Sequence, residues 1–328
     1  MAVLFPTMNN CHDEEEVHAP GEQSSVERSS TPDDDSANVT ICRTDSHLDL
    51  NHYRLEKIEG LSDMPNLKEL CLRCNLITKI ENLNDVSSTL VELDLYDNQL
   101  TKIENLDQLT CLEQLDLSFN RIEKIENLDA LTGLKRLYLV HNRIEKIENL
   151  ELLEQLTLLE LGNNRIRKLE NLESLTKLKE LYVGGNKIVA VENLEKLTEL
   201  RVLSLQDNRI TKIASLNALK NLEGLYLSGN GIKLIEGLEN NCKIQTLDLA
   251  NNKIRSLVDL SFMVNLEEFW FNDNELENLG DLKCLAKCSH LKTVYFERNP
   301  VSTGDPLYRR KVMMELPQLK QIDSTLCR

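Results

Sequence analysis

Several cysteine and histidine residues have spacings that could support metal or redox chemistry. Cys71 and Cys74 form a Cys-x-x-Cys pair, the spacing of half a zinc knuckle or of a redox pair. Cys284, Cys288 and His290 form a second group of soft ligands. The first pair has no second pair at a suitable spacing, and the second group lacks a fourth ligand. We therefore expect neither a metal site nor a cofactor.

Ser118, His141 and Asp97 carry the three side-chain types of a hydrolytic triad. The sequence has no glycine elbow around the serine and no segment that resembles an oxyanion-binding nest. It also lacks a Walker loop and a dinucleotide-binding fingerprint. Mixed polar residues of this kind occur on any solvated edge, so we expect a protein without enzymatic activity.

Aromatic and acidic residues form a more regular pattern. The chain contains one Trp and seven Tyr residues, and five of these eight share one register. They are Tyr138, Tyr182, Tyr226, Trp270 and Tyr295. Four carboxylates have the same register, namely Asp94, Asp116, Glu160 and Asp248, and Glu268 lies two residues before Trp270. Exposed aromatic rings among carboxylates are typical of a surface that binds another protein.

The common register arises from a tandem repeat of 22 residues. Eleven regular units follow L-x-x-L-x-L-x-x-N-x-L/I, from "LKELCLRCNLI" at residue 67 to "LKTVYFERNPV" at residue 291. The interval is 22 residues, except 23 after the first unit and 25 before the last. A degenerate unit, "LDLNHYRLEKI", begins at Leu48 and brings the total to about twelve. This pattern is the signature of the leucine-rich repeat.

Each unit predicts one short strand and a short return segment. The x-L-x-L segment alternates with period two, as a half-buried strand does. The Asn at the ninth position, from Asn75 to Asn299, can bond to backbone groups of a curving loop. The return segment buries residues such as Ile125, Leu128 and Leu131, and its length suits 3₁₀ or single-turn helices. We interpret the recurrent "KIEN" motifs as solvated convex surface.

These features predict an α/β repeat solenoid, a leucine-rich repeat horseshoe with a parallel β-sheet on its concave side. The residue between the two strand leucines should face the concave side. In order, these residues are Cys71, Asp94, Asp116, Tyr138, Glu160, Tyr182, Ser204, Tyr226, Asp248, Trp270 and Tyr295. A general preference of aromatic residues for strands does not explain why they occupy the exposed position rather than the buried one. We therefore predict that this row is a binding face.

A helical cap should close the C-terminal end of the array. Asp305 is suited to the N-cap, Pro306 to the first helical position, and Leu316-Pro317 to the end of the helix. The first 44 residues are acidic and contain few aliphatic side chains. We expect three parts: a disordered acidic tail over residues 1–44, about twelve leucine-rich repeats over residues 45–303, and a C-terminal cap over residues 304–328.

Charge and cysteine content restrict the partners and the compartment. The formal net charge of −16 disfavours nucleic acid and anionic membranes and favours a basic protein partner. Nine scattered cysteines, an odd number, are typical of a reducing compartment. The N-terminus has no signal-peptide pattern, and no apolar run reaches about 18 residues. We therefore expect an intracellular protein.

The sequence over residues 45–328 resembles the leucine-rich repeat regulatory subunits of protein phosphatase 1, an intracellular family with 22-residue repeats. The resemblance lies in "DLNHYRLEKIEGL", "LYDNQ", "IEGLENN", "EFW", "ERNP" and "DPLYRRK". It implies that the concave face binds the catalytic subunit of protein phosphatase 1. The implied contacts are Asp116, Tyr138, Glu160, Tyr182, Asp248, Glu268, Trp270 and Tyr295. At Tyr138 and Tyr182 the family pattern has Phe, so their hydroxyls need solvent or a partner.

The resemblance also implies nuclear and cytoplasmic localisation, a ternary assembly with inhibitor-3, and a monomer before binding. The sequence contains no segment that resembles the short basic-Val-x-Phe peptide by which many other regulators dock on this phosphatase. Binding should therefore come from the folded face. The alternative is a leucine-rich repeat scaffold for another basic partner, such as a cytoskeletal or axonemal protein.

Overall fold

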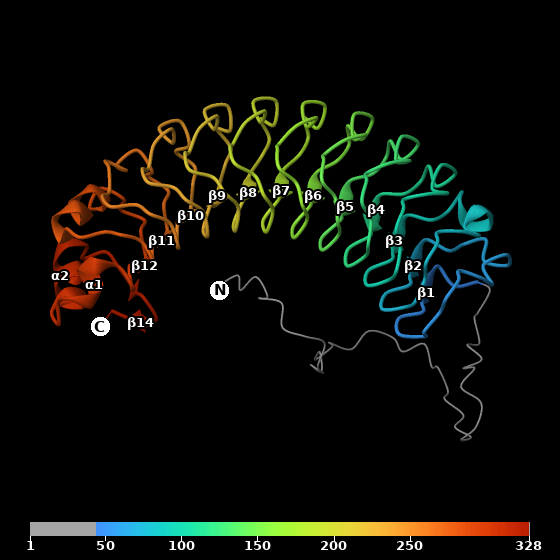
Figure 1. Ribbon diagram of the computed structural model, residues 1–328, viewed down its shortest axis with the longest axis horizontal. Helices are drawn as coiled ribbons and strands as arrows, with labels where there is room; N and C mark the ends of the chain where they lie inside the picture. The colour runs from blue at the N-terminus through green and yellow to red at the C-terminus, as the bar shows by residue number, and fades with distance from the viewer. Residues whose placement is uncertain (1–43, 328) are drawn as a thin grey trace, which may run out of the picture. The chain divides into compact units, whose positions relative to one another are not determined.

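The computed structural model describes residues 44–327, which coil into a curved solenoid (Figure 1). Residues 1–43, the predicted disordered acidic tail without its last residue, lie outside the described residues. Each coil contributes one three-residue strand. The first six strands are β1 His47–Asp49, β2 Glu69–Cys71, β3 Glu92–Asp94, β4 Gln114–Asp116, β5 Arg136–Tyr138 and β6 Leu158–Glu160. The next six are β7 Glu180–Tyr182, β8 Val202–Ser204, β9 Gly224–Tyr226, β10 Thr246–Asp248, β11 Glu268–Trp270 and β12 Thr293–Tyr295.

The strands pair in chain order, parallel from β1 to β13, in one continuous sheet. Equivalent residues of neighbouring coils are directly paired; Asp116, for example, lies opposite Tyr138. The sheet lines the concave side of the arc, so the predicted horseshoe is confirmed. Because the pairing never slips, any residue that recurs at the same repeat position forms a straight row across the molecule.

The core consists of aliphatic side chains that each coil buries against its two neighbours. In the coil of β5, Leu134, Leu137, Leu139, Ile144 and Ile147 are all 0% exposed. One coil cannot bury these side chains alone, so the stack is stable only as an array. Near the C-terminal end, Phe269, Phe271 and Phe296 replace leucines and pack with ring centroids 5.4 to 6.0 Å apart.

The repeated Asn at the ninth position ties each coil to the previous one. Asn142 Nδ2 donates to the carbonyl oxygens of Leu117, Leu139 and Val140, at 2.9 to 3.3 Å. Its Oδ1 accepts the amide of Ile122 at 2.9 Å. The same ladder extends from Asn75 to Asn299. The predicted role of this residue is confirmed.

A second asparagine ladder lies in the "KIEN" motifs, whose Asn residues are exposed or half-exposed, as a solvated surface requires, and also bond to the neighbouring coil. Asn127 has φ 58° and Asn149 has φ 58°, in the left-handed region that Asn tolerates. Asn149 Nδ2 donates to the carbonyl oxygen of Ile125 in the previous coil at 2.7 Å. Equivalent bonds come from Asn82, Asn105, Asn127, Asn171 and Asn193.

The convex side contains fewer helices than predicted. In the described chain, 3₁₀ helices occur at η1 Asn84–Val86 and η2 Leu279–Leu285. Elsewhere the return segments are turns closed by isolated bonds, such as Leu131 N to Leu128 O at 2.9 Å. These bonds have the 3₁₀ spacing but do not follow one another along the chain, so no helical turn is continued.

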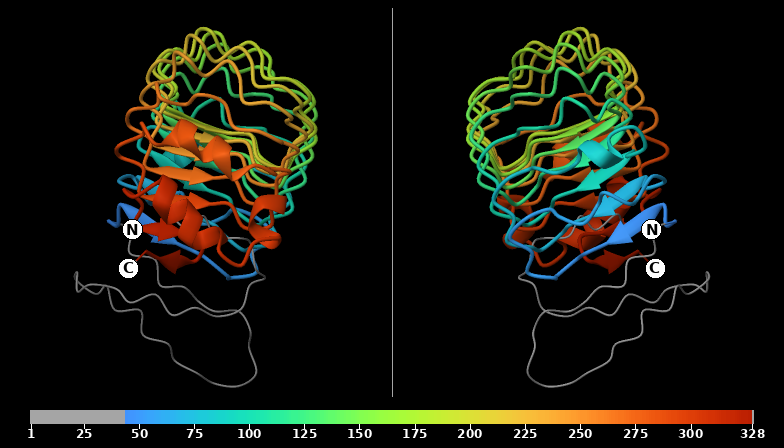
Figure 2. Two further views of the ribbon diagram at one scale, coloured as in Figure 1. Left: turned by 90° about the vertical axis from the view of Figure 1, so that its left-hand side faces the viewer. Right: turned by 90° about the vertical axis from the view of Figure 1, so that its right-hand side faces the viewer.

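Short helices and a hairpin follow the last coil. They are α1 Pro300–Thr303, α2 Tyr308–Glu315, β13 Gln321–Ile322 and β14 Thr325–Leu326. In the end-on views of Figure 2, α1 and α2 cover the β12 end of the stack. The predicted helix ends before Leu316 as expected but begins two residues late, at Tyr308. Its start is delayed because Asp305 accepts the Leu307 amide at 2.8 Å in a separate turn.

The end segment is held together by hydrogen bonds from one arginine. Arg309 donates to the carbonyl oxygens of Ile322, Thr325 and Leu326, at 2.7 to 3.0 Å. The repeat pattern does not predict this hairpin. Across residues 44–327, no helix has the length and apolar character needed to span a membrane.

Candidate partner-binding surface

The predicted row of residues is straight and continuous on the concave face. The sheet register places Asp94, Asp116, Tyr138, Glu160 and Tyr182 on adjacent strands. The register continues through Tyr226, Asp248, Trp270 and Tyr295. Most of these side chains are half-buried, because each lies against its neighbours in the row. The row therefore presents rings and carboxylates at about 4.8 Å intervals, with Ser204 as its one small residue.

An aromatic pair forms the C-terminal end of the row. The rings of Trp270 and Tyr295 lie 5.6 Å apart and are tilted by 58°. Tyr295 Oη accepts a hydrogen bond from Gln321 at 2.8 Å, so the hairpin after the last coil fixes this ring. Trp270 Nε1 is buried and has no hydrogen-bond partner in the described chain. Phe269, which precedes Trp270 in β11, is 0% exposed on the core side and anchors the strand that carries Trp270.

Two carboxylates dominate the N-terminal half of the row. Burial raises the pKa of Asp94 to about 6, and the neighbouring Asp116 adds to the shift. The Tyr96 amide, 2.9 Å from Asp94 Oδ1, and Arg73, whose Nε lies 3.7 Å from Oδ2, lower this pKa in part. Burial also raises the pKa of Asp116, against the effect of its bonds from Ser118. This part of the surface therefore holds partly desolvated negative charge that a cation would stabilise.

The centre of the row combines two tyrosines with Glu160. Tyr182 Oη donates to Glu180 at 2.8 Å, so this hydroxyl has the partner that its position requires. Burial, then Asp116 and Glu180, raise the pKa of Glu160. Within residues 44–327, the Glu160 carboxylate forms no salt bridge within 4.0 Å. Burial raises the pKa of Tyr138 as well.

Asp248 lies below the surface, although the sequence placed it in the exposed row. It is 2% exposed, and Oδ2 accepts a bond from Gln206 at 3.0 Å. Its Oδ1 accepts the Ala250 amide at 3.0 Å. Gln206 also donates to Ser228, and Ser204 is 6% exposed beside them. Asp248 lies between the larger side chains of Tyr226 and Trp270 in the sheet and bonds to Gln206, so it supports the face in the free chain.

A second cluster of aromatic side chains borders the N-terminal, acidic half of the concave row, and it was not predicted from the sequence. Arg73 Cζ lies 4.4 Å from the Tyr96 ring centroid, and Tyr96 lies 4.7 Å from Phe119. Phe119 stacks on His141 at 4.4 Å. These side chains follow the strands of four consecutive coils. Arg73 and Tyr96 occupy the position after the second strand leucine, and Phe119 and His141 occupy the next one. Because the cluster is divided between two repeat positions, neither position alone reveals it.

The structure also places the residues considered for other chemistry. Burial raises the pKa of Cys71 and Cys288 to about 11 and that of Cys284 to about 12. These thiols are therefore protonated at neutral pH. Ser118 is 3% exposed, and its Oγ accepts the Val140 amide at 3.2 Å. A buried hydroxyl of this kind cannot reach a substrate.

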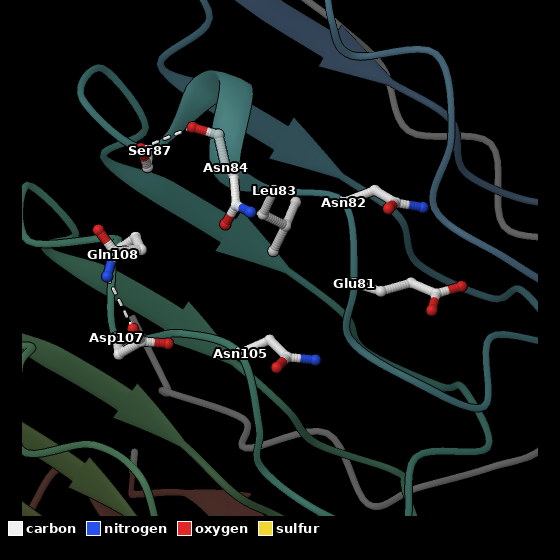
Figure 3. Close-up of a pocket in the computed structure, with 8 residues that line it drawn as sticks. All are labelled: Glu81, Asn82, Leu83, Asn84, Ser87, Asn105, Asp107 and Gln108. Atoms are coloured by element: carbon white, nitrogen blue, oxygen red, sulfur yellow. Dashed lines mark hydrogen bonds between the residues drawn. The ribbon is translucent and has the colours of Figure 1, made fainter.

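A polar hollow lies between the coils of β2 and β3 (Figure 3). Ser87 donates to the Asn84 carbonyl oxygen at 2.7 Å, and Gln108 donates to Asp107 at 2.8 Å. Two more lining amides, Asn82 and Asn105, donate to backbone carbonyls in the second asparagine ladder. The hollow is thus formed by groups that serve the fold, and the concave row remains the candidate site.

The fold and this surface define a repeat solenoid that acts as a scaffold for binding other proteins. A family model described as "Leucine-rich repeat" matches residues 219–327. A second, "Leucine Rich repeats (2 copies)", matches residues 88–130, 112–152, 132–174 and 154–196. The chain belongs to the leucine-rich repeat family.

Two relatives are similar over short segments. Protein phosphatase 1 regulatory subunit 7 of Homo sapiens is 53% identical over 53 residues, which is 16% of this chain and 14% of that protein. Dynein axonemal light chain 1 of Chlamydomonas reinhardtii is 47% identical over 57 residues, which is 17% of this chain and 29% of that protein. The matched part therefore spans less than a third of either relative.

Solved structures share the fold over most of the chain. An internalin (inlF) from Listeria monocytogenes superposes with a TM-score of 0.69. The superposition covers 86% of this chain and 87% of that chain, at 24% sequence identity. This likeness concerns the architecture alone.

Proposed function

We propose that this protein is a non-catalytic regulatory subunit that binds the catalytic subunit of protein phosphatase 1 through its concave face. The proposed contacts are Asp116, Tyr138, Glu160, Tyr182, Asp248, Glu268, Trp270 and Tyr295. Similarity to protein phosphatase 1 regulatory subunit 7 supports the choice of partner. The wider class, a leucine-rich repeat scaffold, follows from the family models.

The Trp270–Tyr295 pair is the observation that carries the proposal. Large rings at a rigid, half-buried position are typical of interface hot spots, where truncation costs about 2 kcal/mol or more. The unsatisfied Nε1 of Trp270 is a buried polar group that costs about 1–3 kcal/mol in the free chain. A small rotation of the ring on binding would bring this donor to an acceptor of the partner.

The charge of the row determines what the partner must present. Asp94, Asp116 and Glu160 lie within four adjacent strands and repel one another. A basic patch on the partner would relieve this repulsion and orient the encounter. Asp248 is 2% exposed and bonds to Gln206, so it is proposed as a supporting residue.

We also propose the wider setting that the resemblance implies. The chain is a monomer before binding, acts in the nucleus and the cytoplasm, and joins inhibitor-3 in a ternary assembly with the phosphatase. The rigidity of the coil stack favours docking of a preformed face with little loss of conformational entropy.

The test is isothermal titration calorimetry of the phosphatase 1 catalytic subunit with the wild type, Trp270→Ala and Glu268→Ala. The control is Leu152→Ala, which removes a 52% exposed apolar side chain away from the strands. We expect Trp270→Ala to lose at least about 2 kcal/mol of binding free energy with the fold intact. Tight binding that tolerates both substitutions on the concave face would keep the partner and reject the site.

A second candidate rests on the similarity to dynein axonemal light chain 1. In that case the same face would bind a basic axonemal or cytoskeletal protein. The two candidates separate in the titration, because only the first predicts binding of the phosphatase. No detectable heat with the wild-type protein would favour the second.

A further inference from the structure

Five cations gather on one flank of the array near its middle, away from the concave row. They are Arg165, Arg167, Lys168, Lys187 and Arg209, and we call them the basic flank. Arg165, Lys187 and Arg209 each follow the ladder asparagine of the coils that contain β6, β7 and β8 (Figure 1). All five side chains are exposed or half-exposed. This local positive charge contrasts with the formal net charge of −16 of the whole chain.

The backbone aligns these cations in a row. The Arg165 amide donates to the Ile144 carbonyl oxygen at 2.8 Å, and the Lys187 amide donates to Ile166 in the same way. The Arg209 amide continues the series by donating to Ile188 at 2.8 Å. Successive side chains therefore start about 4.8 Å apart, one per coil. Arg143 extends the row by one coil toward the N-terminus.

Salt bridges neutralise other cations of the chain but do not reach these five. Arg73, Arg136, Arg201, Arg255 and Arg298 each have a carboxylate within 4.0 Å. In the part of the chain that the structure describes, the basic flank has no such pair.

Lys168 belongs with the unpaired lysines of its repeat position, because Lys102 and Lys124 also precede a glutamate by two residues and have no carboxylate within 4.0 Å among residues 44–327. The equivalent lysines Lys79 and Lys146 pair with Glu81 and Glu148, at 4.0 and 3.8 Å. Lys168 also lies two residues before a glutamate but forms no such contact. In earlier coils Glu123 and Glu145 lie two residues after the row, whereas Arg167 and then Val189 occupy this position here.

The surroundings restrict what can bind. Val189 is 60% exposed and lies within the basic flank. Carboxylates border it: Asp207, Glu170 and Glu192 lie next to the cations along the chain. Glu145 and Glu148 line one hollow together with Arg165. A wide polyanion such as a nucleic acid duplex would bring phosphates against these carboxylates. A single peptide segment would stay on the cations and could cover Val189.

We propose that the basic flank binds an acidic segment of a partner protein, with carboxylates along the cation row and an apolar side chain on Val189. The row lies outside the concave face, so this segment binds while that face is occupied. The array thus carries two surfaces of opposite charge, an acidic one for a basic partner and a basic one for an acidic segment.

Fluorescence anisotropy of the full chain with a labelled peptide tests the proposal. The peptide has a central leucine between two runs of four glutamates, and the neutral comparison replaces every glutamate with glutamine. The test variant combines Arg165→Glu, Lys187→Glu and Arg209→Glu. Its control combines Lys79→Glu, Lys102→Glu and Lys124→Glu, with the same change of charge on other coils. A milder variant with Gln at the three flank positions guards against misfolding, which circular dichroism would reveal.

We expect the flank variant to lose at least tenfold in affinity and the control to stay within about threefold. Wild-type binding should weaken between about 50 and 200 mM salt, as an ionic contact does. Equal affinity for the acidic and neutral peptides, or equal losses in both variants, would overturn the proposal. Tighter binding of a single-stranded oligothymidylate than of the acidic peptide would also overturn the proposal, because it would identify nucleic acid as the ligand of the basic flank. Unchanged phosphatase affinity of the flank variant would separate this surface from the concave one.

Discussion

At the scale of single residues, the concave row gathers groups that the free chain stabilises poorly. Asp94 and Asp116 lie on adjacent strands, and both are mostly withdrawn from solvent. Trp270 leaves a buried indole N–H without an acceptor. Natural folds tolerate such groups where binding later satisfies them, which links the energetics of the free chain to the proposed site.

Asp94→Asn should stabilise the protein at neutral pH. The folded-state pKa of about 6 lies above the ordinary value of 3.8, so the free energy of unfolding falls as the pH rises between these values. Asn keeps the acceptor for the Tyr96 amide and removes the charge. We expect a gain of about 1 kcal/mol near pH 7.5, since partial exposure screens the charge. Urea unfolding should show less than half of this gain near pH 4.5, and a gain independent of pH would contradict the assignment.

Tyr182→Phe tests whether the hydroxyl serves the fold or the interface. It removes the bond to Glu180, which is worth about 0.5–1.5 kcal/mol. We expect a loss of this size in chemical denaturation and phosphatase affinity within about threefold of wild type, because the ring supplies the contact. A loss of affinity of tenfold or more would instead place the hydroxyl in the interface.

At the scale of elements, two asparagine ladders and the aliphatic layers hold the coils in register. The first ladder could be predicted from the sequence, because its Asn recurs next to the strand leucines. The second was not predicted, because its Asn residues lie on the solvated surface beside charged Lys and Glu and the sequence does not show the backbone angle. Its αL conformation is also found where the Asn is absent, at Ser215 (φ 58°) and Gly237 (φ 69°).

The second ladder makes a specific prediction about Asn149, whose side chain bonds to Ile125 and whose φ is positive. Asn149→Ala loses the bond and also strains the backbone, for a total of about 2 kcal/mol. Asn149→Gly loses the bond but adopts positive φ easily. Thermal or urea unfolding should therefore rank wild type above Asn149→Gly and Asn149→Gly above Asn149→Ala. The reverse order of the two variants would show that the backbone angle is unimportant here.

At the scale of the whole molecule, each coil contacts mainly its two neighbours. A substitution that destabilises one coil should therefore unfold the coils between it and the nearer end of the array first. The twelve strands, their parallel order and the concave row could be predicted from the repeat period alone. The hairpin after α2 and the burial of Asp248 could not, because both depend on side chains from distant segments. Gln206 bonds to Asp248 from two coils away, and Arg309 links α2 to the hairpin.

Arg309→Ala should loosen the C-terminal end and leave the middle of the array intact. It removes three hydrogen bonds to the hairpin, and the hairpin fixes Tyr295 through Gln321. Hydrogen exchange should accelerate in β12 to β14 and stay slow in β5 to β8. Faster exchange over the whole array would show instead that the coils unfold together.

Hydroxyl-radical footprinting of the complex tests the central claim most directly, because it reports on the side chains that line the proposed site. We expect Trp270, Tyr295 and Tyr138 to become protected when the phosphatase 1 catalytic subunit binds. Leu152 and Met314, which are 52% and 74% exposed on other surfaces, should react as before. Protection of these two side chains with an unchanged concave face would show that the phosphatase binds elsewhere.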